Sequence, residues 1–256
     1  MQSTHASGPA GSIVFAGRSL DGPALVVGFA VAVCVVGLGF SLVVPAVLIV
    51  GLQFLGVELP LVLTYAAELL LTDLVGFGLA TGAYLRLRGL SREYVHVHRP
   101  TRRDLGWMVG GSAAVLVLYF GFMAAAAALG APSARSGISI AGNTDPNVLL
   151  LIAVLSFVLI APMEELFFRG VVQETMSEAV PGLVAVVLAS LLFAAVHVIT
   201  LVGPLAGALV SLTSMFITSL VLGFAYLRSR NLLVNVVIHG TYNATLLLIG
   251  YVMLGP

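Results

Sequence analysis

Long apolar runs separated by short polar stretches dominate the pattern along the chain. A helix that spans a membrane needs about 20 apolar residues. Seven segments meet this requirement: 24–50, 60–85, 105–130, 148–172, 182–200, 205–227 and 232–254. The first run contains Gly37, Gly39 and Pro45, so it is expected to be kinked or split, and a split would add an eighth helix. The pattern predicts an all-α, polytopic membrane helix bundle with seven spans, or eight.

The same pattern predicts a simple domain organisation. Residues 1–23 are small and polar, and we predict a flexible N-terminal tail there. The apolar run that follows is about 30 residues long, which exceeds the apolar core of a signal peptide, so this tail is not expected to be a cleaved leader. Neither an internal repeat nor a soluble domain is evident. Residues 24–256 are therefore predicted to form a single transmembrane domain.

Arginine placement predicts the orientation of the spans. The stretch 86–103, between the second and third spans, carries six arginines, and the turn before the last span carries Arg228 and Arg230. The loop 131–147 on the opposite side holds only Arg135. Because cytoplasmic loops are enriched in basic residues, we expect a multi-pass protein of the cell membrane with a cytoplasmic N-terminus.

Composition narrows the classes of function. Hydrophobic residues make up 60% of the chain and charged residues only 9%, and the net charge is zero; this excludes the basic face that nucleic-acid binding requires. All eleven basic residues are arginines, which excludes a Ser–Lys dyad or a Schiff base. The single cysteine, Cys34, excludes an intrachain disulfide. His96 and His98, in the arginine-rich stretch, are expected to be solvated near lipid headgroups.

Ionisable residues at membrane depth indicate where chemistry could occur. Each costs about 2.5–3.5 kcal/mol on insertion scales and persists when it is paired or useful. The fourth span holds Glu164, Glu165 and Arg169 within six positions. Glu165 and Arg169 are spaced i,i+4 and can neutralise each other, whereas Glu164 points about 100° away. The alternative is a structural ion pair with one protonated carboxyl, but that role would not require a second glutamate.

Polar residues in two later spans complete the set. The fifth span holds His197, and the seventh holds Asn235, His239 and Asn243 on one face. A rise of 1.5 Å per residue, counted from the neighbouring turns, places Glu164, His197 and His239 at a similar depth. A single membrane histidine more often bonds a neighbouring helix, but three matched depths favour a shared site.

These residues resemble the three signature motifs of the CPBP family, which contains the type II CAAX prenyl endopeptidases and the Abi proteins. The motifs are Glu-Glu-x-x-x-Arg at 164–169, Phe-x-x-x-His at 193–197 and His-x-x-x-Asn at 239–243. Each motif alone is weak, whereas the ordered set is specific. The resemblance covers about residues 60–254, with the signature region at about 148–254.

The resemblance implies an intramembrane endopeptidase that cuts peptide bonds near the cytoplasmic side of the membrane. It implies that Glu164 and His197 activate a water, and that His239 and Asn243 stabilise the oxyanion. A further set is implied to support this site: Glu165, Arg169 and Phe193. The implied partners are the lipid bilayer and a membrane-associated protein or peptide substrate, lipidated or not.

The resemblance leaves the cofactor open, because the family has been described both as metalloproteases and as metal-independent glutamate proteases. Two histidines and a glutamate could hold a divalent metal such as zinc, and the residues would be Glu164, His197 and His239. The sequence lacks His-Glu-x-x-His. The first expectation is therefore a mechanism that needs no cofactor.

Parts of the sequence are compatible with three other functions. Ser112, in a Gly-x-Ser-x pattern, could indicate a rhomboid-like serine protease, although small residues there are more typical of close helix packing. Glu68 and Asp73 could relay protons in a transporter, against which stand the odd number of spans and the lack of a repeat. They could equally line a protease cavity. The third alternative is a catalytically silent scaffold or immunity protein of the same fold.

Overall fold

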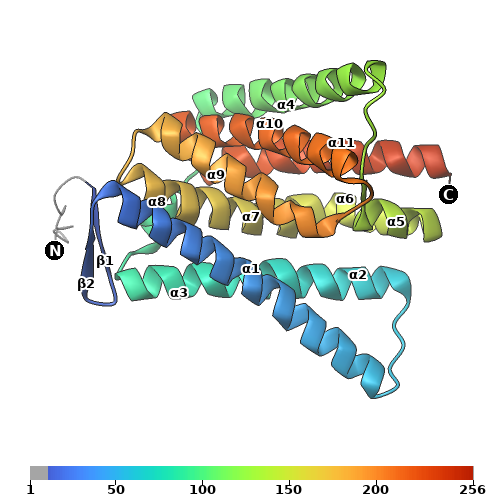
Figure 1. The fold of residues 1–256 in the computed structure, drawn as a ribbon, viewed down its shortest axis with the longest axis horizontal. Coiled ribbons are helices and arrows are strands. Elements are labelled where there is room, and N and C mark those ends of the chain that lie inside the picture. Colours follow the sequence, from blue (N-terminus) through green and yellow to red (C-terminus); the bar gives the residue numbers. More distant parts are fainter. Residues whose placement is uncertain (1–10, 256) are drawn as a thin grey trace.

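The computed structural model describes residues 11–255 and is built almost entirely of helices that run roughly along one axis (Figure 1). Among the described residues, seven helical segments are long and apolar enough to cross a membrane, which confirms the predicted number of spans. They are α1 (Pro23–Phe54); α2 (Leu61–Leu69) continued by η1 (Leu70–Phe77) and α3 (Gly78–Arg88); α4 (Arg102–Ala128); α6 (Asn147–Leu155) continued by η3 (Ser156–Ile160), α7 (Ala161–Phe167), η4 (Phe168–Gln173) and α8 (Glu174–Ser177); α9 (Gly182–Val196) with η5 (His197–Thr200); α10 (Leu205–Ser229); and α11 (Leu232–Leu254).

The first span is one helix. It starts with Pro23 at its first position, where a missing N–H does no harm, and continues through Pro45. Of the alternatives for this run, a split into two helices is therefore not found, and the run contributes one span.

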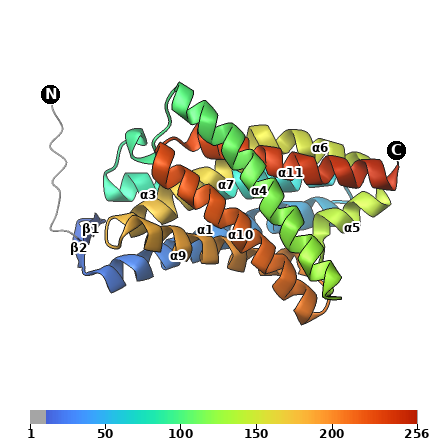
Figure 2. The ribbon, with the colours of Figure 1, turned by 90° about the horizontal axis from the view of Figure 1, so that it is seen from above.

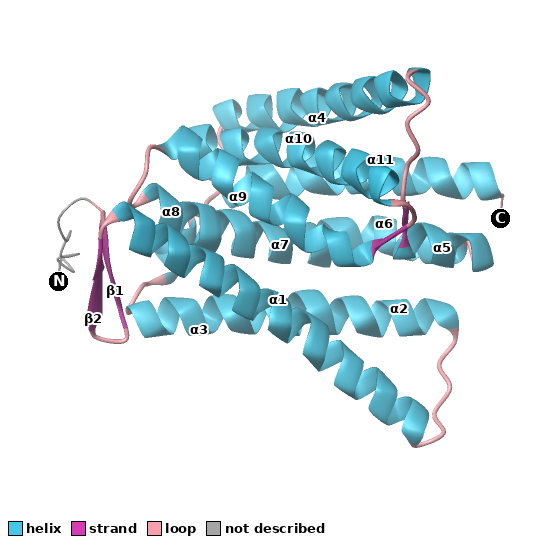
Figure 3. Ribbon diagram, viewed as in Figure 1, coloured by secondary structure: helices cyan, strands magenta, loops and turns pink. Residues whose placement is uncertain are grey.

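Short elements lie at the two ends of the bundle (Figure 3). At one end, β1 (Ser12–Phe15) and β2 (Arg18–Asp21) form an antiparallel hairpin. At the other end, β3 (Arg135–Ser136) pairs with β4 (Leu201–Val202), and α5 (Gly137–Thr144) follows β3. The 3-10 helix η2 (Arg92–Val95) lies in the arginine-rich stretch.

The hairpin changes the prediction for the N-terminal tail. That prediction covered residues 1–23, of which 1–10 lie outside the described residues. Over 12–21 a disordered tail is wrong, because the hairpin is fastened to α3: the Ala16 N–H donates to the Leu87 carbonyl at 3.0 Å. Local polarity was misleading here because cross-strand and helix contacts satisfy the backbone.

Three π-helical segments interrupt the second and fourth spans. η1 lies in the middle of the second span, and η3 and η4 bracket α7 in the fourth. A π-helical turn widens the helix and is frequent at functional sites. Both spans that carry acids at membrane depth are therefore the ones whose helical geometry is altered.

Close packing brings these two spans together with α1. Figure 1 shows α1 crossing the second span diagonally, and at the crossing a Cβ on Gly76 would lie 2.6 Å from the Cα of Ser41, so only glycine fits. Beside the crossing, Phe77 stacks on Phe167 with ring centroids 5.0 Å apart, and Phe168 meets Phe193 at 5.0 Å. These aromatic rings form an apolar floor beside the acidic segment of the fourth span.

Candidate active site

Glu165 on α7 is the centre of a fully buried polar cluster. Its Oε2 accepts hydrogen bonds from Arg169 Nε at 3.0 Å and from Asn235 Nδ2 at 3.0 Å. Its Oε1 lies 2.9 Å from His239 Nδ1. The i,i+4 pairing of Glu165 with Arg169 is thus confirmed, and the same carboxylate also holds the last span in place.

Arg169 ties this cluster to a third span and to the aromatic floor. Its Nη2 donates to Ser219 Oγ on α10 at 2.9 Å, and its Cζ lies 5.4 Å from the centre of the Phe193 ring. Burial of an arginine is tolerable only when it is paired and hydrogen-bonded. Glu165 and Ser219 meet that need, so the supporting residues Glu165, Arg169 and Phe193 do lie together.

Glu164 lies on the opposite side of His239 from Glu165. Its Oε2 is 3.7 Å from His239 Nε2, and its side chain is 14% exposed while that of His239 is 5% exposed. The imidazole is therefore held between two carboxyl groups, one at each ring nitrogen. The predicted proximity of Glu164 and His239 is confirmed.

His197 is placed one residue layer away from this pair. It begins η5 at the end of α9, and its ring centroid lies 4.6 Å from that of Phe193, which in turn lies 6.0 Å from that of His239. Its Nδ1 lies 2.6 Å from the Phe193 carbonyl. Because a carbonyl only accepts, Nδ1 carries the proton and Nε2 is the free acceptor. His197 and His239 thus contact the same ring, that of Phe193, as expected for similar depths. Within the described part of the chain, His197 makes no hydrogen bond or ion pair with Glu164.

The two asparagines of the last span differ from expectation. Asn243 is half-buried and makes no side-chain hydrogen bond with any described residue. Asn235, one turn before His239, is fully buried and donates to both Glu165 and the Leu222 carbonyl at 2.8 Å. Asn235 is therefore a member of the cluster that motif matching missed, although the i,i+4 spacing to His239 was a signal for it.

Asp73 on η1 adds a third acid. It is 1% exposed, its Oδ2 has no hydrogen-bond partner among the described residues, and it lies within electrostatic reach of Glu164. Four residues on, Phe77 packs against the fourth span. Glu68, the other acid of this span, is exposed. The sequence did not separate the roles of these two acids. In the structure Asp73 is buried on a segment that packs against α7, whereas Glu68 is exposed.

The donor set for a metal was tested in the same geometry. Over residues 11–255, no group of three His, Cys, Asp or Glu side chains converges closely enough to hold an ion. Glu164, His197 and His239 are therefore not grouped closely enough to hold an ion in this arrangement. Nδ1 of His239 is engaged by Glu165 and Nδ1 of His197 by the Phe193 carbonyl, which leaves Nε2 as the ring nitrogen of each that could bind a metal.

The polar end of the fourth span is structural. Gln173, Thr175 and Met176 are packed inside the protein, each at most 1% exposed. Glu174, within this segment, and Glu178, just after it, pair with arginines from other elements. Tyr84 and Thr175 are hydrogen-bonded side chain to side chain. A rim of paired charges therefore covers the end of the helix that leads to Glu164.

Comparison with known proteins gives a match over nearly the same residues as the predicted signature region. Residues 146–245 match the family model described as "Type II CAAX prenyl endopeptidase Rce1-like". The match covers 100 of the 256 residues and includes the signature motifs. Neither a curated protein nor a solved structure gives a significant match to the chain.

The Rce1-like region contains most of the cluster. It spans η3, α7 and η4 with both glutamates and Arg169, and it extends through His197 to His239 and Asn243. The predicted signature region, 148–254, agrees closely with it. Asp73 lies outside, on a span that the family model does not cover.

Proposed function

We propose that this Rce1-like membrane protein is an intramembrane endopeptidase that hydrolyses peptide bonds in membrane-associated proteins or peptides. The observation that carries the proposal is that His239 lies between two carboxyl groups, with Glu164 at Nε2 and Glu165 at Nδ1. It places a partly accessible carboxyl beside an imidazole whose other nitrogen is fixed by a second carboxyl. Paired carboxyl groups in different surroundings are the usual basis for dividing acid and base roles.

The tautomer of His239 follows from its partners. Glu165 is hydrogen-bonded to a guanidinium and accepts only, so Nδ1 of His239 donates to it. Nε2 therefore carries a proton only in the imidazolium, a form that Glu165 favours electrostatically. The 3.7 Å gap between Nε2 and Glu164 is longer than a hydrogen bond, and such pairs commonly tighten when substrate arrives.

Hydrolysis would proceed in two stages. Glu164 takes a proton from a water whose oxygen bonds to the scissile carbonyl carbon, and the carbonyl π electrons move to its oxygen. The Nε2–H of His239 donates to that oxyanion. An electron pair of the oxyanion then re-forms the C=O bond as the C–N bond breaks, the C–N electrons go to nitrogen, and Glu164 returns the proton to the leaving amine. Each step uses groups already placed in the cluster.

His197 and Asn243 enter this proposal through the family resemblance. His197 has a free Nε2 acceptor on the Phe193 side of the site and would help to orient the water. Asn243, without a side-chain partner among the described residues, would add a donor to the oxyanion. We propose that the reaction needs no metal, that the substrate approaches from the arginine-rich side, and that this side is cytoplasmic.

The decisive experiment compares purified wild-type protein with Glu164→Gln and His239→Ala on fluorogenic prenylated and unprenylated peptides and on membrane-anchored candidates. General acid–base groups contribute roughly 10²–10⁴-fold, so each variant should lose cleavage by that factor. Glu58→Gln, an exposed acid outside the cluster, is the matched control and should keep full activity. Full activity in both cluster variants would end the proposal.

Three further measurements separate the alternatives. Treatment with a chelator should leave cleavage unchanged if no metal is needed, and loss restored by zinc would show a metalloenzyme. His197→Ala tests the resemblance: a loss of cleavage equal to that of Glu164→Gln supports water activation by both groups. Ser112→Ala should be active, because α4 contributes no side chain to the hydrogen bonds of the cluster.

A further inference from the structure

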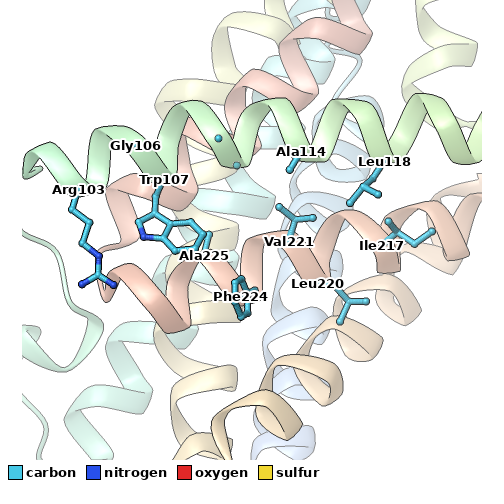
Figure 4. A pocket seen from close by; sticks show the side chains of 12 residues that line it. Arg103, Gly106, Trp107, Ala114, Leu118, Ile217, Leu220, Val221, Phe224 and Ala225 are labelled. Carbon is cyan, nitrogen blue, oxygen red and sulfur yellow. The ribbon is translucent and has the colours of Figure 1, made fainter.

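A groove runs along the outside of the bundle between α4 and α10. Figure 2 shows these two helices crossing side by side on one face of the molecule. The cavity between them has a volume of about 730 Å³. Its lining is mostly apolar and comes from both helices, with side chains that include Trp107, Ala114, Leu118, Val221 and Phe224 (Figure 4).

Glycines on α4 create this groove. A Cβ on Gly106 or Gly110 would meet nothing within 4 Å, so neither glycine is needed for contact between helices. Gly111 is different, because a Cβ there would lie 2.3 Å from Ile238 Cδ1 on α11. Gly111 permits close packing, as the sequence predicted for small residues here, whereas Gly106 and Gly110 leave the surface hollow.

Two arginines border one end of the groove. Arg103 belongs to its lining, and Figure 4 shows its side chain reaching from α4 toward α10. Arg228 stands near the same end and places its Cζ 5.6 Å from the ring centre of Phe224, another lining residue. Neither arginine has a carboxylate partner in the described part of the chain, although four other arginines or acids of this end are paired. The groove is therefore apolar along most of its length, and at one end it carries two arginines without carboxylate partners among the described residues.

The dimensions match one leaflet of a bilayer. From Gly106 to Leu118 the groove follows α4 for about 18 Å at 1.5 Å per residue. Half of a hydrocarbon core of about 30 Å is about 15 Å. The arginine-lined mouth thus lies at headgroup level when the apolar floor lies among acyl chains.

We propose that the groove between α4 and α10 is a binding site for an anionic phospholipid, with an acyl chain along the glycine-lined floor and the phosphate at Arg103 and Arg228. Guanidinium groups pair with phosphate through a planar pair of donors. An anionic headgroup would supply the negative charge that neither arginine receives from a carboxylate of the protein. A zwitterionic lipid would also bring a positive charge next to the two arginines.

This site is separate from the polar cluster. Consecutive residues of α10 face the two places: Ser219 receives the hydrogen bond from Arg169, and Leu220 and Val221 line the groove. The proposal therefore stands independently of peptidase activity, and its test measures lipid binding alone.

Native mass spectrometry of the purified full chain, titrated with phosphatidylglycerol and phosphatidylcholine of identical acyl chains, tests the proposal. Juxtamembrane arginines each attract anionic lipid appreciably, so we expect a preference of about tenfold for phosphatidylglycerol. Arg103→Gln with Arg228→Gln should bring that ratio close to one. Arg102→Gln, an exposed neighbour outside the groove lining, should preserve it.

Filling the groove gives an independent measurement. Gly110→Leu should weaken retention of both lipids, because the new side chain occupies the floor. Gly121→Leu, also on α4 and also facing open space but outside the lining, is the matched control and should bind as wild type does. Equal retention of the two lipids by wild type, or an unchanged preference in the double arginine variant, would overturn the proposal.

Discussion

Two regions of the molecule contain ion pairs of arginine with glutamate. They differ in how many of the hydrogen-bonding groups of the arginine and its neighbours have a partner. At the rim, Arg230 donates from both terminal nitrogens to Glu174 at 2.7 Å, and Arg88 does the same to Glu178 at 2.7 and 3.0 Å. These bidentate pairs are partly open to solvent: Arg230 is 42% exposed. Burial acts against the charge on Arg230, but the hydrogen bonds that it donates to Glu174 outweigh this effect and raise the pKa of the guanidinium.

In the membrane interior the pairing is incomplete. Arg169 reaches Glu165 through Nε, and its buried Nη1 has no partner among the described residues. Asn235 Oδ1 and Asp73 Oδ2 are also buried and have no hydrogen-bond partner among the described residues. Buried polar atoms without partners cost free energy, and three of the six such atoms of the described residues belong to Arg169, Asn235 and Asp73. The difference indicates that the rim fixes the helices, whereas the interior cluster retains polar groups for a function.

The largest expected effect comes from breaking the interior pair. Glu165→Leu leaves Arg169 buried without its carboxylate, so the free energy of unfolding should fall by about 3–5 kcal/mol, measured by unfolding in mixed micelles. Adding Arg169→Leu should recover most of that loss, because an apolar pair replaces the isolated charge. Glu174→Gln at the rim is the matched control and should cost about 1 kcal/mol or less. Equal losses at the two pairs would contradict the comparison.

A smaller change with opposite signs for stability and activity is expected at Asp73. Asp73→Asn keeps the shape and removes a buried carboxyl whose Oδ2 has no hydrogen-bond partner among the described residues, so stability should rise by about 0.5–2 kcal/mol. If Asp73 belongs to the working site, peptide cleavage should fall at the same time. Glu68→Gln, an exposed acid of the same span, should change neither. Reduced stability in Asp73→Asn would mean that the carboxyl is a structural partner.

The smallest effect concerns pH at the rim. Arg230 Nη2 lies 2.9 Å from His96 Nε2, which must accept, and Tyr226 Oη lies 3.3 Å from Nδ1. Burial and the nearby Arg230 lower the pKa of His96, although Glu174 opposes this. Since the folded pKa lies below the unfolded value of about 6.5, the stabilisation is present above that pH and is lost as pH falls through the folded pKa.

Thermal unfolding between pH 5 and pH 8 measures this effect. The midpoint temperature of the wild type should drop on the acidic side, and His96→Gln, which stays neutral and can still accept from Arg230, should flatten the curve. A slope that persists unchanged in His96→Gln would assign the pH dependence to other groups. The expectation that His96 is simply solvated is wrong, because the left-handed turn at this residue (φ 50°) directs it toward α10.

Much of the architecture follows from the sequence because lipid imposes a single rule: backbone groups in the hydrocarbon must bond within helices. Runs of apolar residues therefore located all seven spans to within a few residues. The hairpin over residues 12–21 escaped the same logic, since its stability comes from contacts with α3 rather than from its own composition.

The candidate site was predicted less completely. Depth counting brought Glu164 and His239 together correctly because rise along a helix is regular. It could not show which nitrogen of His239 meets which glutamate, nor that Asn235 rather than Asn243 joins the cluster. Rotation about each helix axis decides these contacts, and the π-helical turns change that rotation in a way that an ideal 3.6-residue period does not describe.

The placement of those wide turns has a consequence for how this span can vary. η3 and η4 bracket the seven residues of α7, which hold both glutamates. The outer parts of the span are held by contacts with α11 and by the paired charges of the rim. Each π-helical turn allows α7 to be rotated about the helix axis relative to these outer parts. The orientation of the acidic segment is thus uncoupled from the register of its flanks. Deleting one residue from η3 would restore a regular helix and swing Glu164 away from His239, although every side chain of the cluster would still be present.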